Sequence, residues 1–67
     1  MCEAIVFLNT QGTEKEIMRE VLTLEVGEGN RLLLTDLFGE RRELEAKVKN
    51  IDFLHHKVLL EEVKTSV

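Results

Sequence analysis

The only cysteine of this 67-residue chain, Cys2, is the residue whose position most strongly suggests chemistry. A thiol beside the amino terminus can act together with nearby nitrogen atoms and close five-membered chelate rings on one metal ion. If Met1 is removed, amine and thiolate both belong to Cys2; if it is retained, the Met1 amine joins the Cys2 amidate and thiolate. Either set suits Ni(II), which accepts nitrogen and sulfur ligands in a square plane. Two copies across a dimer axis would complete an N₂S₂ plane. The alternative is a small apolar residue that only packs at the start of a strand.

The two histidines, His55 and His56, are the second candidates for metal binding. Adjacent side chains point to opposite faces of a strand, so both could reach one ion only from a turn. Histidines in solvent, or hydrogen-bonded to a backbone carbonyl, are favoured here over metal ligands. No HxxxH or CxxC spacing accompanies the pair. Cys2 and Met1 are therefore the predicted metal-binding residues.

Charge and composition argue against nucleic-acid binding. The net charge is −4, and the chain has three Phe, no Tyr and no Trp, whereas RNA-binding surfaces need clustered cations and exposed aromatic rings. A small RNA-binding module is nevertheless the alternative function. It would need a continuous basic strip, for which the candidates are Arg31, Arg41, Arg42, Lys47 and Lys49.

No enzymatic activity and no catalytic residues are predicted. A nucleophilic Cys2 paired with a histidine would need a pocket that so small a domain hardly offers. A third possibility is a structural interaction domain without any ligand, in which Cys2 only packs.

Short strands must position these residues. The apolar, β-branched and aromatic run at residues 4–8 predicts a buried strand, with the core on one face and a dimer interface on the other. Residues 13–25 fit both an amphipathic helix and a strand. The strand is favoured, with a possible break near Arg19 and Glu20.

A predicted hairpin at residues 31–48 organises the rest of the chain. Apolar and charged residues alternate along its second half, as in a half-buried antiparallel strand. In its turn, Asp36 can accept hydrogen bonds from backbone amides and Gly39 can take a positive φ. Phe38 is expected to be buried and to anchor the turn to the core.

Size and pattern predict an all-β fold, a small five- to six-stranded antiparallel barrel. The expected organisation is a single domain over 1–62 with a loose tail over 63–67. A chain of 67 residues buries little core, so a homodimer is expected to supply the missing burial. A lone cysteine, with no signal peptide or membrane span in the sequence, favours a cytoplasmic location and no membrane partner.

Several short motifs together resemble the CooT-like family. They are Met1-Cys2-Glu3-Ala4, the Gly12 and Glu14 turn, Asp36-Leu37-Phe38-Gly39-Glu40, and Ile51-Asp52 followed by His56-Lys57-Val58-Leu59-Leu60-Glu61. The resemblance implies a homodimeric barrel of SH3-like or Sm-like kind that binds one Ni(II) at the dimer axis through Cys2. It also implies a metallochaperone-type accessory role, with nickel delivered to carbon monoxide dehydrogenase or a related client enzyme. Such proteins are also labelled predicted RNA-binding proteins, which keeps a small Sm-like RNA-binding module as the alternative.

Overall fold

Five β-strands joined by short turns make up most of residues 3–63, the part of the chain that the computed structural model describes. They are β1 (Ala4–Thr10), β2 (Thr13–Val26), β3 (Arg31–Asp36), β4 (Arg41–Asp52) and β5 (Lys57–Glu62). One turn of 3-10 helix, η1 (Glu28–Asn30), connects β2 to β3. The prediction of an all-β fold is confirmed. Over these residues, no helix has the length and apolar character needed to cross a membrane.

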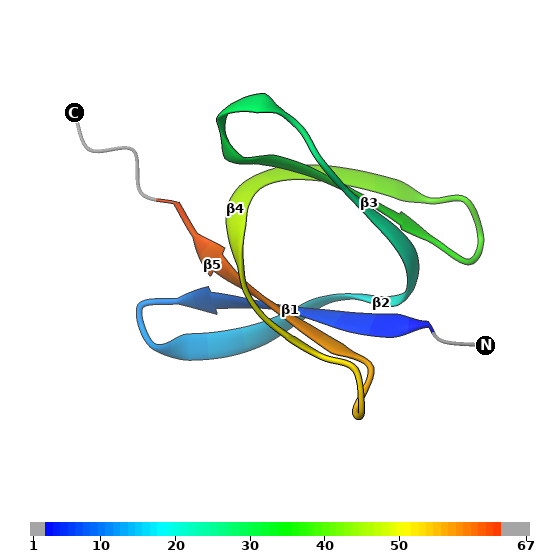
Figure 1. The fold of residues 1–67 in the computed structure, drawn as a ribbon, viewed down its shortest axis with the longest axis horizontal. Coiled ribbons are helices and arrows are strands. Elements are labelled where there is room, and N and C mark those ends of the chain that lie inside the picture. Colours follow the sequence, from blue (N-terminus) through cyan, green and yellow to red (C-terminus); the bar gives the residue numbers. More distant parts are fainter. Residues whose placement is uncertain (1–2, 64–67) are drawn as a thin grey trace.

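The strands close into a ring (Figure 1). Each is hydrogen-bonded to the next in chain order, and β5 returns to β1. Four strand pairs are antiparallel, but β1 and β5 run parallel, with Ile5 opposite Lys57. In a chain that runs up and down, the first and last of an odd number of strands point the same way. The predicted antiparallel arrangement is therefore wrong for the closing pair and correct for the other four.

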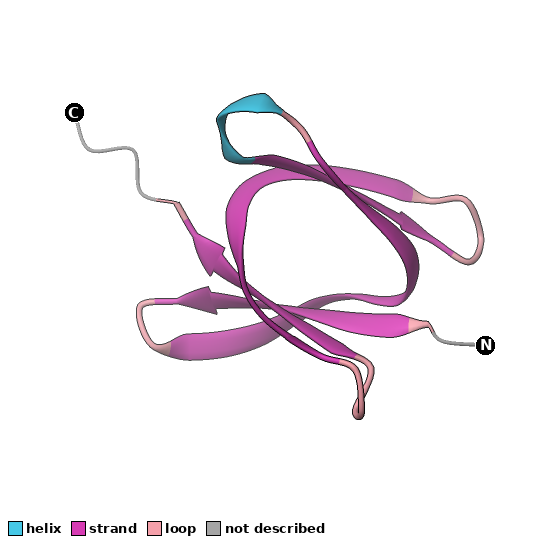
Figure 2. Cartoon of the chain, viewed as in Figure 1, coloured by secondary structure: helices cyan, strands magenta, loops and turns pink. Residues whose placement is uncertain are grey.

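The long strand β2 allows so few strands to close a ring. Its first part pairs with β1 as far as Val21, and its last part pairs with β3 from Val21 onward. The register with β1 shifts between the Val6–Met18 and Ala4–Val21 pairs, and Glu20 has a φ of 57°. Such a bulge bends a strand and increases its twist. Figure 2 shows β2 bending as one strand around the ring. The predicted strand is confirmed, but at the possible break near Arg19 and Glu20 the strand has a bulge and continues.

The hydrophobic core fills the inside of the ring. Its buried side chains are Val6, Val21, Leu32, Leu34, Ala46 and Leu60. The alternation on β3, where Leu32 and Leu34 are buried and Leu33 is only partly covered, is the period of two that a strand requires. Burial of each large aliphatic side chain contributes roughly 1.5–3 kcal/mol.

The β3–β4 turn follows the predicted chemistry but not the predicted burial. Oδ1 of Asp36 accepts hydrogen bonds from the backbone N–H groups of Phe38 (2.9 Å) and Glu40 (2.8 Å), and Gly39 has a φ of 83°. Phe38, in contrast, is 79% exposed. The expectation that it anchors the turn in the core is wrong, because Phe38 lies in the turn beyond the end of β3 and no strand covers it. The turn is held instead by the Asp36 side chain.

Both ends of the chain extend past the described residues. Met1 and Cys2 precede them, and residues 64–67, most of the predicted tail, follow them. The last strand ends at Glu62. The start of β1 is thus the nearest described element to the predicted metal-binding residues.

Candidate metal site

The predicted ligands Cys2 and Met1 lie outside the described residues, so the site is built from the elements beside them. On one side of β1, Ala4 pairs with Val21 of β2. On the other side, the backbone N–H of Ile5 donates a hydrogen bond of 2.8 Å to the carbonyl oxygen of His56. The start of β1 therefore lies between the bulge of β2 and the turn that joins β4 to β5 (Figure 1).

The β4–β5 turn carries both histidines. Asp52, the last residue of β4, accepts a hydrogen bond from the backbone N–H of His55 at Oδ1 (3.1 Å). Its Oδ2 lies 2.8 Å from Nδ1 of the same histidine. His56 follows with a φ of 54° and leads into β5. The turn is thus fixed at its start by a carboxylate and at its end by the bond from Ile5.

Both histidines lie in a turn and are exposed to solvent, which agrees with the interpretation favoured from the sequence. The contact of the His55 ring with the Asp52 carboxylate was not predicted. The signal was present as an Asp-x-x-His spacing at the end of a strand, since Asp side chains commonly bind groups a few residues on in a turn.

The contact with His55 changes the acidity of Asp52. The hydrogen bond from the His55 side chain, with a further one from its backbone N–H, holds the pKa of the Asp52 carboxyl below its ordinary value. A lowered pKa in the folded state means that the ionised carboxylate favours folding above the pKa of the unfolded chain. This contribution is lost as the pH falls through the lower, folded-state pKa. Because the turn is exposed to solvent, the effect on stability is small.

Replacing His55 by Ala should therefore raise the pKa of Asp52 toward that of an ordinary aspartate. The side-chain carboxyl carbon of Asp52, followed by NMR as a function of pH, gives this value directly. Glu16, whose pKa is lowered by Arg19, supplies an internal control that should titrate as before. An unchanged Asp52 titration in the variant would show that the His55 contact does not set this pKa.

Within residues 3–63, no three His, Cys, Asp or Glu side chains gather in a way that could hold a metal ion. The β4–β5 turn lies next to the start of β1 through the bond between Ile5 and His56. Metal binding by Cys2 and Met1, which lie outside these residues, stays a prediction.

Three of the five candidate basic residues for RNA binding face acids or a backbone carbonyl. Nη1 of Arg31 lies 3.8 Å from Oε2 of Glu43, and Lys47 is directly across the strands from Glu61. Arg42 donates a hydrogen bond of 3.0 Å to the carbonyl oxygen of Ile17. Because acids and a backbone carbonyl face these cations, their arrangement does not favour binding to a phosphate backbone.

The chain matches a known family of accessory proteins over most of its length. Residues 1–61 match a family described as an accessory protein of CO dehydrogenase, which is a helper of an enzyme rather than an enzyme itself, as predicted. That family is CooT, and the chain belongs to it.

A solved structure agrees with this assignment. A crystal structure described under the CooT name, from Carboxydothermus hydrogenoformans, is 33% identical in sequence, with a TM-score of 0.85. The match covers 94% of this chain and 100% of that one. No curated protein matches the chain.

Proposed function

We propose that this protein is a nickel-binding accessory protein that supplies Ni(II) to carbon monoxide dehydrogenase or a related enzyme. Two chains form a homodimer, and Cys2 of each contributes a thiolate to one ion at the dimer axis. The Met1 amine or backbone nitrogen completes the ligand set. The observation that carries this proposal is the family match over residues 1–61, which includes Cys2 and describes an accessory protein of CO dehydrogenase.

The chemistry of the donors supports nickel as the cargo. A thiolate with amine or amidate nitrogen favours a d⁸ ion in a square plane over hard cations such as Mg²⁺, which prefer oxygen. The thiol must lose its proton to bind, so metal uptake releases protons. The role of the protein is then to hold these donors in place and present them to a client.

The balance of buried and exposed apolar residues supports a dimer. Within residues 3–63, more large hydrophobic side chains are exposed than the small core buries. The exposed ones are Leu22, Val26, Leu37, Phe38, Val48, Ile51, Phe53 and Leu54. A monomer of this size has a marginal core, and a two-fold interface would cover part of this surface.

A Ni(II) titration of freshly reduced protein, followed by absorption spectroscopy, tests the proposal. We expect charge-transfer bands that saturate at one ion per two chains, with a dimeric mass measured on the same sample. Cys2→Ser should lose these bands and the tight binding, because a hydroxyl does not replace a thiolate as a soft ligand.

The variant must remain a folded dimer for this result to count, which the same mass measurement and a circular dichroism spectrum establish. Retained nickel affinity in Cys2→Ser would contradict thiolate ligation. Steep loss of RNA affinity with added salt, in a protein without nickel bands, would favour the RNA-binding alternative instead.

A further inference from the structure

One edge of β2 has no strand beside it among residues 3–63. The first part of β2 pairs with β1 from Thr13 to Val21, whereas β3 pairs with the other edge of β2 only from Val21 onward. This second edge is therefore open over residues 13–19, and we call it the β2 edge. An open edge carries unpaired N–H and C=O groups, so it can pair with a further strand.

The register of the β1–β2 hairpin fixes which backbone groups point out of the β2 edge. Thr10 and Thr13 flank a two-residue turn, and further along the hairpin Glu16 lies opposite Phe7. Hydrogen-bonded and non-bonded pairs alternate in an antiparallel hairpin, beginning with a bonded pair beside the turn. The N–H and C=O of Glu14 and Glu16 thus face away from β1 and toward the open edge.

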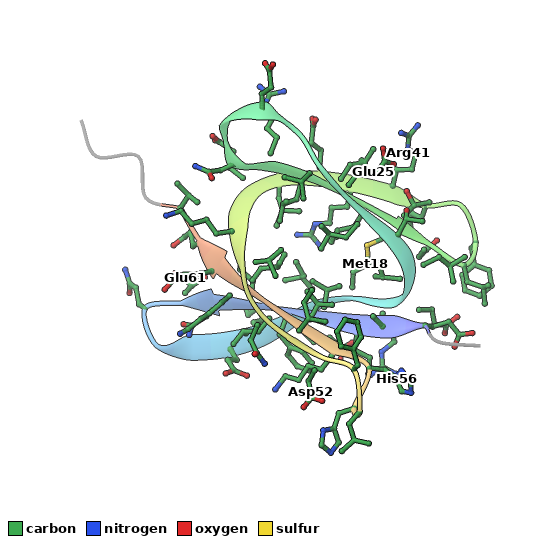
Figure 3. The ribbon with its side chains drawn as sticks, viewed as in Figure 1. Met18, Glu25, Arg41, Asp52, His56 and Glu61 are labelled. Atoms are coloured by element: carbon green, nitrogen blue, oxygen red, sulfur yellow. The ribbon has the colours of Figure 1, made fainter. Side chains whose placement is uncertain are left out.

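A β-bulge places two opposite charges on one face of this edge. Arg19 binds Glu16 through two hydrogen bonds of 2.8 and 2.9 Å, although residues three apart point to opposite faces of a regular strand. The register shift between the Phe7–Glu16 and Val6–Met18 pairs inserts one residue and brings them to the same face. Met18 points the other way, toward the inside of the ring, where it packs against the core (Figure 3).

The charges of the β2 edge are complementary to those of a second copy. If two segments 15–20 run antiparallel about a two-fold axis at their centre, Glu16 of each copy lies opposite Arg19 of the other. Lys15 then lies opposite Glu20. A shift by one residue would instead place Lys15 opposite Arg19, or Glu16 opposite Glu20. Because opposite charges across a strand pair stabilise it and like charges destabilise it, the sequence favours one register of self-pairing.

The surroundings of the β2 edge allow a strand to approach. A hollow of about 230 Å³ lies beside Ile17 and Met18 and is also lined by Arg41 and Arg42. Arg42 donates a hydrogen bond of 3.0 Å to the carbonyl oxygen of Ile17. In the register described above, Ile17 and Met18 face each other as a non-bonded pair. The hydrogen bond of Arg42 can therefore stay in place.

The β3–β4 turn continues the surface at the end of the β2 edge. The N–H of Leu37 donates a hydrogen bond of 2.8 Å to the carbonyl oxygen of Glu20. The turn thus begins where the open edge stops, and it exposes Leu37 and Phe38. A second copy along the edge would lie against these two side chains and remove apolar surface from water.

We propose that two copies of this protein dimerise through the β2 edge, with antiparallel β2 strands that continue the sheet of one copy into that of the other. Glu16 and Arg19 are the central contacts, and their charges set the register. The inference rests on the homodimer of the proposed function, because it assigns the interface of that dimer.

Charge reversals at the two central positions test this interface by sedimentation of the full-length protein. In Glu16→Arg, positions 16 and 19 are both positive; in Arg19→Glu, both are negative. We expect each variant to raise the dissociation constant of the dimer by about 10-fold or more, because like charges then face each other between copies. Glu28→Arg, a charge reversal in η1, should change it by no more than about twofold.

A mixture of the two variants separates the contact between copies from the Glu16–Arg19 pair within one copy. In a mixed dimer, the positive charges of one chain face the negative charges of the other, although each chain still lacks its internal ion pair. We therefore expect the mixture to recover dimers that neither variant forms well alone. Variants as dimeric as the unmodified protein, or a mixture without recovery, would overturn the proposed interface.

Amide hydrogen exchange followed by NMR supplies a measurement on the unmodified protein. The N–H of Glu16 should exchange about 10-fold more slowly, or slower still, in the dimer than in the diluted monomer, because the second strand covers it. The N–H of Lys15 faces β1 and should change much less. Equal exchange of the Glu16 amide in monomer and dimer would contradict strand pairing at this edge.

The outcomes distinguish this interface from the nickel function. A dimer that is indifferent to the charge reversals would overturn the β2 interface and leave nickel binding standing. A dimer that responds as expected, in a protein without nickel absorption bands, would overturn nickel binding alone. An unmodified protein that stays monomeric with and without Ni(II) would overturn both the interface and the shared site.

Discussion

Leu34→Ala should destabilise the protein by about 2–5 kcal/mol, the usual cost of removing a large aliphatic side chain from a core. Leu34 is fully buried inside the ring and lies on β3, which pairs with both β2 and β4. The total stability expected for a domain of this size is roughly 3–10 kcal/mol. We therefore expect a variant that is partly or fully unfolded at room temperature.

Urea unfolding followed by circular dichroism measures this effect, since the chain has no Trp or Tyr for fluorescence. Leu33→Ala is the matched control, because Leu33 is the preceding residue on the same strand and points away from the core. Its loss should be clearly smaller. Equal losses for the two variants would contradict the alternation of β3 described above.

Asp36→Ala should have the second-largest effect, a loss of about 2–4 kcal/mol. Asp36 is only 8% exposed, and its Oδ1 accepts hydrogen bonds from two backbone N–H groups of the β3–β4 turn. Alanine would leave these donors without their acceptor and would remove what holds the turn. Thermal or urea unfolding gives the change in free energy.

The stability of Asp36→Asn shows whether the hydrogen bonds of Asp36, rather than its charge, account for the effect of this residue. The asparagine carbonyl oxygen can still accept from Phe38 and Glu40, so the loss should be only about 1 kcal/mol. If the Ala and Asn variants were equally destabilised, the two hydrogen bonds would not be the reason that Asp36 matters.

Local patterns allowed most of the fold to be predicted. The period of two identified the strands, and the residue types of the β3–β4 turn identified the roles of Asp36 and Gly39. The burial of Phe38 was predicted wrongly because hydrophobicity alone does not say which way a turn residue points. The parallel β1–β5 pair was missed because its direction depends on the number of strands in the whole ring, which no short segment contains.

The candidate site was less accessible to sequence reasoning, because long-range pairing assembles it. His56 and Ile5 are far apart in the sequence and meet only where β5 returns to β1. The contact between Asp52 and His55 requires β4 to continue to Asp52, past the bulge between Val48 and Asn50. The possible metal binding of Cys2 could be proposed from the sequence, because it depends only on the residue type and on its position beside the amino terminus.

The closing pair also has a consequence for the order of events during synthesis. A ribosome makes β1 first and β5 last, and β5 is the partner that brings His56 to the start of β1. Contacts between distant segments form late, because the intervening chain must first be ordered. A nascent chain that has not yet released β5 therefore presents the start of β1 without the turn beside it. The ring is closed, and this edge of β1 is covered, only after β5 has been made.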